Sequence, residues 1–191
     1  MRAFESQSAA LSGKGTLLCC LVAGLLLFSA AGTAVAECRT SDLYLSAAPQ
    51  RFEQREDVVV DNVTGLMWRH CLLGLSGDTC SVGEAAFLSW EGALAAAAVD
   101  STAGYTDWRL PNIKELASLV EYACIAPSMD PLQFPNPGAP RPGGDAEISY
   151  IVWSATPYYD SALIRYLDFG NAADNAVKRS SEQLTRLVRD L

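Results

Sequence analysis

The sequence predicts an α+β fold, in which two helices pack on a small, mainly antiparallel sheet with long loops. Two segments, 89–98 and 112–124, begin with helix-capping residues and continue with apolar residues at helical spacing. Short apolar stretches rich in β-branched and aromatic residues predict strands at 58–60, 66–68, 150–156, 162–169 and 184–188. The six prolines of segment 127–144 exclude regular structure there, so this segment is a long excursion inside one domain.

Residues 1–36 are predicted to be a cleavable signal peptide. Two basic residues precede an uncharged apolar run, and Ala34-Val35-Ala36 supplies the small residues that signal peptidase requires. The run 16–31 is shorter than the roughly 20 residues that a membrane-spanning helix needs. A lipoprotein is also disfavoured, because a leucine precedes Cys19 where that cleavage site requires a small residue. We therefore expect an exported chain that starts at Glu37, is periplasmic, envelope-associated or secreted, and has no stable membrane span.

The expected mature chain is strongly acidic. Without the leader's two basic residues and one acidic residue, 12 of the 14 basic and 21 of the 22 acidic residues remain, a net charge of −9. Nucleic-acid binding depends on Lys and Arg that neutralise phosphates, so this charge argues against a nucleic-acid partner. It equally disfavours broad attraction to anionic lipid or sulfated sugar. A local basic patch stays open near the C-terminus, formed by Lys178, Arg179, Arg186 and Arg189.

Four cysteines remain after residue 36, an even number that predicts two disulfides in an exported domain. Cys71 and Cys80 flank a turn-rich loop that closes easily on itself, so we favour Cys71–Cys80 and, by elimination, Cys38–Cys124. The rival is a metal site that uses Cys71, Cys80 and the single histidine, His70. Adjacent side chains of an extended chain diverge and no fourth ligand is evident, so no metal is expected.

The chain between residue 37 and the C-terminus divides into an irregular, polar segment, 37–54, and one domain, 55–191. At the start of the domain, 58–60 and 66–68 predict a hairpin. The turn between them is Asp61-Asn62-Val63-Thr64-Gly65, in which Asp and Asn bond nearby amides and Gly accepts a positive φ.

The first helix is predicted over 89–98, with Ser89 as N-cap and one face formed by positions 90, 94 and 97. The second helix follows Pro111, with Asn112 as N-cap and Glu115 completing a capping box, and is expected to end near 122–124. The residues expected in the core are Trp68, Trp90, Leu94, Trp108, Leu116 and Leu119.

Several segments in a fixed order resemble the Lcl C-terminal domain family. They are Asp61-Asn-Val-Thr-Gly-Leu-Met-Trp68, Ser89-Trp-Glu-Gly-Ala-Leu94, Tyr105-Thr-Asp-Trp-Arg-Leu-Pro-Asn-Ile-Lys-Glu-Leu116, Phe134-Pro-Asn136, Trp153-Ser-Ala-Thr156 and Arg186-Leu-Val-Arg189. The resemblance covers about residues 55–191 and implies a C-type-lectin-like fold in an exported bacterial protein. The adhesin that names the family binds sulfated polysaccharide. This chain differs from it in lacking a collagen-like repeat and in its acidity.

No catalytic constellation is evident. Asp107 and Arg109 flank Trp108 on one face of an extended segment, so an ion pair between them is the expected role. Ser154 and Ser180 have no histidine at hand other than His70, which disfavours a nucleophilic triad. The Arg-Leu-Pro that starts at Arg109 also resembles formylglycine-generating enzymes, but no cysteine follows Cys124, where that family places its reactive pair. We expect no enzyme activity and no cofactor.

A ligand surface is predicted from aromatic and polar residues late in the chain. Trp153, Tyr158 and Tyr159 lie around a Ser-Ala-Thr-Pro stretch, and sugar sites combine aromatic faces with polar edges. Core packing is the competing role for Trp153 and rim packing for the tyrosines. Asp168, Asn171, Asp174 and Asn175 form an oxygen-rich loop, which turn formation explains without calcium. The candidate ligand-binding residues are therefore Trp153, Tyr158, Tyr159, Asp174 and Asn175.

The sequence predicts a non-catalytic, adhesin-like domain of the cell envelope that binds a glycan or an envelope protein. Two alternatives stay open, an enzyme related to the formylglycine generators and a purely structural envelope protein.

Overall fold

The computed structural model describes residues 37–39, 43–143, 147–160 and 162–191. The predicted signal peptide lies outside the described residues. Within the described part of the chain, no helix is long and apolar enough to cross a membrane.

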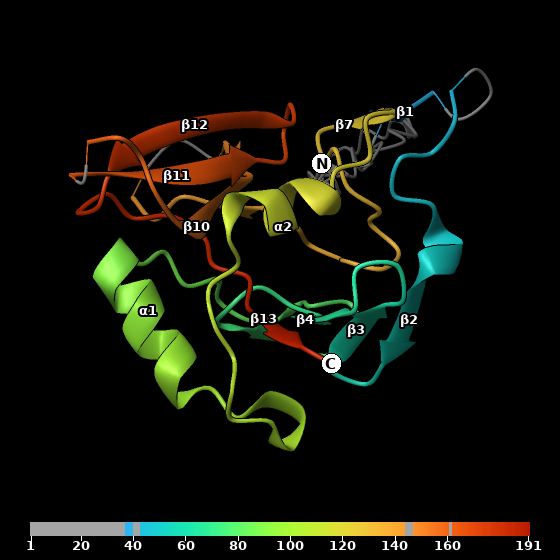
Figure 1. The fold of residues 1–191 in the computed structure, drawn as a ribbon, viewed down its shortest axis with the longest axis horizontal. Helices are drawn as coiled ribbons and strands as arrows, with labels where there is room; N and C mark the ends of the chain where they lie inside the picture. Colours follow the sequence, from blue (N-terminus) through green and yellow to red (C-terminus); the bar gives the residue numbers. More distant parts are fainter. Residues whose placement is uncertain (1–36, 40–42, 144–146, 161) are drawn as a thin grey trace, which may run out of the picture. The chain divides into compact units, whose positions relative to one another are not determined.

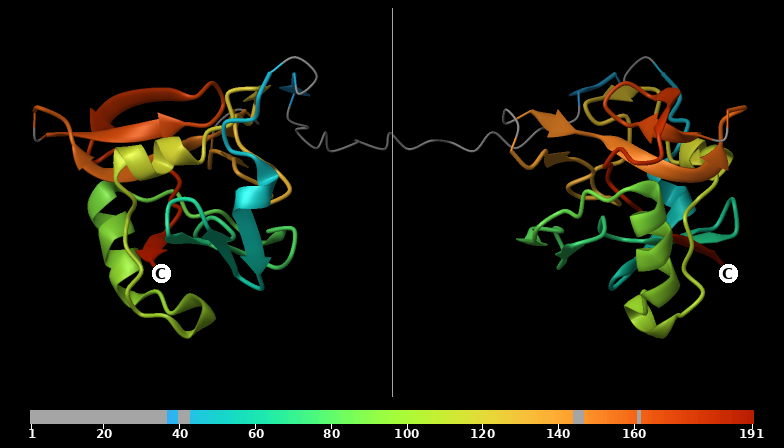
Figure 2. Two further views of the ribbon diagram at one scale, coloured as in Figure 1. Left: turned by 45° about the vertical axis from the view of Figure 1, so that its right-hand side comes forward. Right: turned by 90° about the vertical axis from the view of Figure 1, so that its left-hand side faces the viewer.

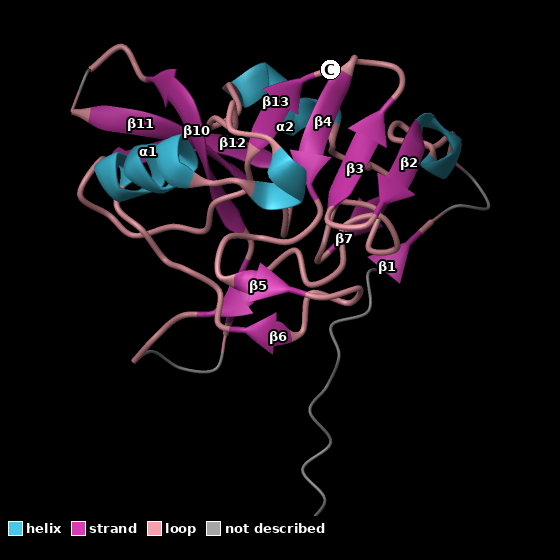
Figure 3. Cartoon of the chain, turned by 90° about the horizontal axis from the view of Figure 1, so that it is seen from below, coloured by secondary structure: helices cyan, strands magenta, loops and turns pink. Residues whose placement is uncertain are grey.

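The described residues form an α+β fold with two α-helices and several antiparallel sheets, as the sequence predicts (Figure 1). The helices are α1 (Trp90–Val99) and α2 (Ile113–Ser118), and short 3-10 helices cover Pro49–Arg51 and Thr102–Gly104. A four-stranded sheet has the order β13 (Val188–Asp190), β4 (Leu66–Arg69), β3 (Val58–Asp61) and β2 (Phe52–Arg55). Figure 3 shows these four strands side by side.

A three-stranded antiparallel sheet contains β10 (Ile151–Pro157), β11 (Leu163–Asp168) and β12 (Ala173–Lys178). Helix α2 contacts β10 and β11, and Figure 2 shows it against this sheet. Three further pairs contain two-residue strands: β1 (Glu37–Cys38) with β7 (Cys124–Ile125), β5 (Leu75–Ser76) with β6 (Val82–Gly83), and β8 (Ala139–Pro140) with β9 (Ile148–Ser149).

Strand β3 is buried along its length because both faces of the four-stranded sheet are covered. Val59 points into a core that contains Trp68, Leu116 and the Cys71–Cys80 disulfide. Val58 and Val60 point into a second core, under α1, that contains Trp108 and Trp153. The predicted hairpin is confirmed, since β3 pairs with β4 across a turn in which Gly65 has φ 69°.

Both predicted helix starts are confirmed. Ser89 Oγ accepts a hydrogen bond from the Gly92 amide, and Asn112 and Glu115 form the capping box. Helix α2 is shorter than predicted, because it ends at Ser118 instead of near 122–124. The chain after it turns back, and the Glu121 carboxylate accepts from the Ala123 amide instead of continuing a helix face.

The core prediction is right for Trp68, Trp108, Leu116 and Leu119, which are buried, and wrong for Leu94. Leu94 is 37% exposed, while Ala93 and Ala97 are buried. Positions 90, 93 and 97 share one helix face and position 94 lies about 100° away from 93, so the small alanines form the contact and Trp90 is half-buried beside them.

Three further sequence predictions need correction. Segment 37–54 is not irregular throughout, since β1 and most of β2 lie within it. Strand β2 is a sheet edge with only Phe52 buried, so its polar sequence concealed it. The predicted strand 184–188 begins later, as β13 at Val188. Residues 173–175, predicted as part of a loop, are in β12, another polar edge strand.

Candidate functional site

The five candidate ligand residues do not form one surface. Trp153 is fully buried and its Nε1 donates to the Leu88 carbonyl at 2.7 Å, so the prediction that it contacts ligand is wrong and its alternative, core packing, is confirmed. Asn175 pairs with Tyr166 on the neighbouring strand. Because successive side chains of a strand point to opposite faces of the sheet, Asn175 and its neighbour Asp174 lie on opposite faces of β12. An aromatic residue in a strand can either pack in the core or line a surface site, and the sequence pattern does not distinguish these two roles.

Tyr158, Tyr159 and Asp174 do lie on the surface, connected through Arg165. The two tyrosine rings are 4.5 Å apart, and Tyr159 is 91% exposed. Arg165 lies 5.9 Å from the Tyr158 ring centre and forms a two-bond ion pair with Asp174. Asp174 is thus already occupied by a cation, which leaves the tyrosines as an exposed rim.

The predicted Asp107–Arg109 ion pair is wrong. Arg109 forms hydrogen bonds at 2.9 Å with both carboxylate oxygens of Glu115 and one at 2.8 Å with Asp190. Asp107 pairs instead with Arg189, whose hydrogen bond holds the Asp107 pKa below its ordinary value. The carboxylates of this region are therefore structural. Asp107 and Asp190 join β13 to the segment before α2, and Glu115 joins that segment to α2.

The basic patch that the sequence left open near the C-terminus is not formed. Arg186 is fully buried, Arg189 pairs with Asp107, and Arg179 lies 3.4 Å from Glu91. Neutralised or buried arginines give little long-range attraction to a polyanion.

A cavity of about 510 Å³ opens where β9 and β10 meet the β11–β12 turn. This volume lies in the range of small-molecule sites. Its lining combines one basic residue, two acidic residues, a tyrosine and an amide, together with short polar and apolar groups: Arg141, Glu147, Ile148, Ser149, Tyr150, Ile151, Asp168, Gly170 and Asn171.

The Tyr150 ring is held in place by two glycines. A Cβ on Gly138 would lie 2.5 Å from Tyr150 Cδ1, and one on Gly170 would lie 3.2 Å from Cδ2. Any side chain at Gly138 would displace the ring, so glycine is required there for close approach. The ring is therefore a fixed part of the cavity wall.

Polar groups around this ring are only partly satisfied. Arg141 donates to the Glu182 carbonyl at 2.9 Å and to Ser149 Oγ at 3.3 Å, which fixes its guanidinium. Asp168 Oδ1 accepts from the Gly170 amide at 2.8 Å, and Asn171 Oδ1 accepts from the Ala173 amide at 3.0 Å.

Three polar groups of the lining stay available. Within the described residues, the Tyr150 hydroxyl, Asp168 Oδ2 and Asn171 Nδ2 make no hydrogen bond. Burial also raises the pKa of Tyr150, which keeps its hydroxyl protonated and able to donate. The cavity therefore offers a donor and acceptor set beside an aromatic ring.

Two residues that line this cavity, Asp168 and Asn171, were predicted from the sequence as part of an oxygen-rich loop. Arg141 and Tyr150, which also line it, were not predicted as site residues. Arg141 is the single basic residue between Lys114 and Arg165, and it lies in the proline-rich excursion. An isolated arginine in such a segment was a sequence signal that could have marked it as a site residue.

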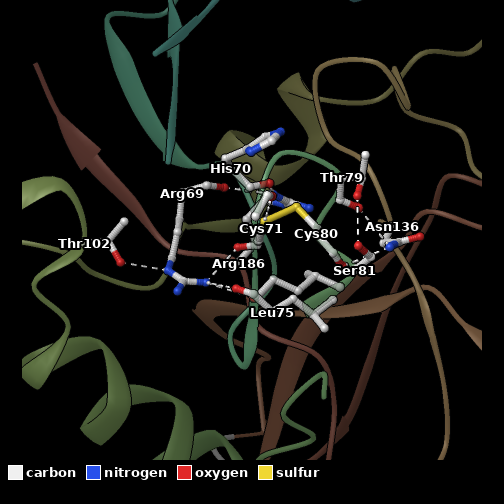
Figure 4. Close-up of a disulfide and its surroundings, with 12 residues drawn as sticks. Arg69, His70, Cys71, Leu75, Thr79, Cys80, Ser81, Thr102, Asn136 and Arg186 are labelled. Carbon is white, nitrogen blue, oxygen red and sulfur yellow. Dashed lines mark hydrogen bonds between the residues drawn. A yellow bond between two sulfur atoms is a disulfide. The ribbon is translucent and has the colours of Figure 1, made fainter. Parts of the chain in front are cut away.

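Both predicted disulfides are present, Cys38–Cys124 and Cys71–Cys80. The expectation that His70 and Cys71 diverge is wrong, because a ring nitrogen of His70 and the two sulfurs of Cys71 and Cys80 all lie within 4.8 Å of one another (Figure 4). Burial, with a contribution from Arg186, lowers the pKa of His70. With both sulfurs bonded to each other, they are not thiolate ligands in this state.

The family model of the Lcl C-terminal domain matches residues 57–189. The chain belongs to the Lcl C-terminal domain family. The match begins just before β3 and ends within β13, so the Lcl C-terminal domain contains every residue that lines the cavity and the Cys71–Cys80 disulfide. Cys38 lies outside the match and is joined to Cys124 inside it, which fastens the preceding segment to the domain. No curated protein matches the chain.

Proposed function

We propose that this chain is an exported, non-catalytic, adhesin-like domain of the cell envelope with a C-type-lectin-like fold, and that its cavity binds a glycan. The observation that carries the proposal is the ring of Tyr150, fixed between two glycines and surrounded by unpaired hydrogen-bonding groups. Sugar rings stack their C–H faces on aromatic rings and exchange hydroxyl hydrogen bonds with polar edges. The two disulfides are compatible with export.

The charge of the cavity supports neutral or amino sugars over sulfated ones. Glu147 and Asp168 both line it, and the single cation, Arg141, is already held by the Glu182 carbonyl and Gln183. A protonated amine would find a carboxylate oxygen of Asp168, whereas a sulfate would meet two like charges. Salt should therefore weaken binding only for a charged ligand.

The test is a glycan array on the disulfide-intact protein, followed by titration of each hit against two matched variants. Tyr150→Phe keeps the ring and removes the hydroxyl, and Asp168→Asn keeps the shape and removes the charge. Each should weaken binding about tenfold, since a hydrogen bond to a charged group is worth roughly 1.5–3 kcal/mol and a buried polar group left without a partner costs roughly 1–3 kcal/mol.

Tyr159→Ala is the control, because Tyr159 belongs to the separate exposed rim. Binding lost in Tyr159→Ala and kept in Tyr150→Phe would move the glycan site to the rim. If no glycan binds saturably and an envelope protein is captured at the cavity, the ligand is a protein and not a glycan. If no ligand of either kind binds, a structural role is favoured.

The competing function is an enzyme related to formylglycine generators. Its chemistry needs a reactive cysteine pair near the C-terminal end, and no cysteine follows Cys124. Thiol titration and metal analysis of exported protein with both disulfides intact separate the two, since the enzyme requires a free thiol or a bound metal in that state.

A further inference from the structure

The Cys71–Cys80 disulfide, at the end of β4, has an unusual set of neighbours. Cys71, Cys80 and His70 are all buried, with exposed fractions of 4%, 0% and 1%. Their two sulfurs and one imidazole nitrogen lie within 4.8 Å of one another. Sulfur and imidazole are the soft ligands that d10 metal ions bind.

His70 supplies an observation independent of the cluster. Its Nε2 is buried and has no hydrogen-bond partner among the described residues. A buried polar nitrogen without a partner costs free energy, so its retention calls for an explanation. A metal-coordinated imidazole would satisfy it.

Arg186 adds an uncompensated positive charge beside this cluster. It is fully buried, donates from Nη1 to the carbonyls of Arg69 and His70, and packs 4.9 Å from the centre of the Phe134 ring. Within the described residues its Nε and Nη2 have no partner, and no acidic side chain compensates its charge. Burial of a cation without a counter-ion is costly, so this position favours a neighbour with net negative charge.

The backbone around the sulfurs is held by bonds other than the disulfide. Asn136 Nδ2 donates to the carbonyls of Thr79 and Cys80 at 3.0 and 2.9 Å. Arg69 Nη1 donates to the Cys71 and Leu72 carbonyls at 3.1 and 2.9 Å. Figure 4 shows these two clamps on either side of the sulfurs. Cleavage of the S–S bond therefore leaves both cysteines fixed close to His70.

We propose that, once reduced, Cys71, Cys80 and His70 bind one Cu⁺ ion. A dithiol transfers two electrons to the disulfide and is itself oxidised to a disulfide, which leaves two protein thiols. Binding of Cu⁺ then releases both thiol protons and forms two copper–sulfur bonds and one copper–nitrogen bond.

Charge and ligand number favour Cu⁺ over Zn²⁺. Two thiolates and Cu⁺ carry a net charge of −1, which neutralises the buried Arg186, whereas two thiolates and Zn²⁺ are neutral and leave it uncompensated. The cluster found among the described residues offers three ligands, enough for three-coordinate Cu⁺ but one fewer than structural Zn²⁺ takes.

The test uses full-length chains in which Cys19→Ser and Cys20→Ser remove the other two cysteines. One variant adds Cys38→Ser and Cys124→Ser and so keeps only the proposed site. The matched control adds Cys71→Ser and Cys80→Ser instead. Each is titrated without oxygen, before and after reduction with a phosphine, against the coloured Cu⁺–bicinchoninate complex, whose absorbance falls as the protein takes copper.

The first variant should take one Cu⁺ per chain after reduction and none before it, and the control should take none in either state. His70→Gln in the first variant should weaken binding by about tenfold or more. Equal uptake by the two variants, an unchanged affinity with His70→Gln, no uptake by a folded reduced chain, or displacement by equimolar Zn²⁺ would each overturn the assignment.

Far-UV circular dichroism checks the fold of each chain. If the chain without Cys38 and Cys124 does not fold, the chain with both disulfides reduced is compared with the control. Uptake must then fall from one Cu⁺ to none when Cys71 and Cys80 are replaced, and any smaller fall contradicts the proposal.

Discussion

The two disulfides join the chain in different ways. Cys38–Cys124 spans 86 residues and connects the short strand pair of β1 and β7, where Cys38 is exposed. Cys71–Cys80 spans nine residues, and both cysteines are buried in the core with Trp68 and Leu116. The first bond fastens a peripheral segment, while the second is part of the packed interior. Sequence separation and burial therefore predict opposite rankings of their importance for stability.

Removal of the long-range disulfide should give the largest loss of stability. In the chain-entropy account, a bond that closes a loop of this length stabilises by about 4.5 kcal/mol, against about 2.7 kcal/mol for the short loop. We therefore expect Cys38→Ala with Cys124→Ala to lower the free energy of unfolding more than Cys71→Ala with Cys80→Ala. Denaturant titration of both double variants measures the difference. The reverse order would show that the sulfur packing of the buried pair outweighs loop closure.

The core around the buried disulfide can be calibrated with Leu116→Ala. Leu116 is fully buried in the same cluster, so its truncation should cost about 2–5 kcal/mol. Leu94→Ala is the matched control on α1, where the side chain is partly exposed and the expected cost is below about 1 kcal/mol. Thermal unfolding of both variants is the measurement, and an unchanged melting curve for Leu116→Ala would contradict the placement of α2.

A weaker effect should separate the surroundings of the two disulfides. Residue 136 has a φ of 44°, which glycine tolerates. Asn136→Gly therefore leaves the backbone unstrained and removes both side-chain hydrogen bonds to the loop that ends at Cys80. Loss of these bonds should cost about 1–3 kcal/mol. Cys71–Cys80 should then be reduced faster and Cys38–Cys124 at its original rate, as followed by alkylation and peptide mass mapping. Equal acceleration of both would mean that the variant loosens the whole fold.

Local signals in the sequence predicted much of the fold. The capping residues Ser89 and Asn112, the β3–β4 turn and both disulfides are determined by short-range chemistry, and all are confirmed. The edge strands β2 and β12 were missed because solvent-facing strands need no apolar alternation. The register of Leu94 was missed because an alanine-rich helix has no distinct apolar face.

The candidate site depended on contacts that no local pattern encodes. Arg141 and Tyr150 reach the cavity only after the proline-rich excursion folds back on β10, and Tyr150 needs Gly138 and Gly170 beside it. Arg109 likewise forms ion pairs with Glu115 and Asp190, and not with Asp107, which lies two positions before it. The Arg109–Asp190 pair, like the cavity, depends on tertiary packing between residues far apart in the chain.

Acid should destabilise the two disulfide regions in different pH ranges, through His70 near Cys71 and Glu121 near Cys124. Burial and then Arg186 lower the pKa of His70 from 6.5, with Asp57 and Asp78 opposing them in part. Burial opposes ionisation of Glu121, but the Ala123 and Ala47 amides donate to its carboxylate and hold its pKa below 4.5. Both groups therefore have folded-state pKa values below those of the unfolded chain.

A depressed pKa in the folded state means that the unfolded chain binds the proton first as the pH falls. The contribution of each group to stability is thus complete above its unfolded pKa and is lost as the pH falls through its folded pKa. For His70 the loss should begin below pH 6.5, and for Glu121 below pH 4.5. His70→Gln should flatten only the higher range of the stability profile and Glu121→Gln only the lower one, as measured by denaturant unfolding at stepped pH. If Glu121→Gln also flattened the higher range, the two regions would titrate as one coupled unit, and the separation between the peripheral fastening and the core disulfide would fail.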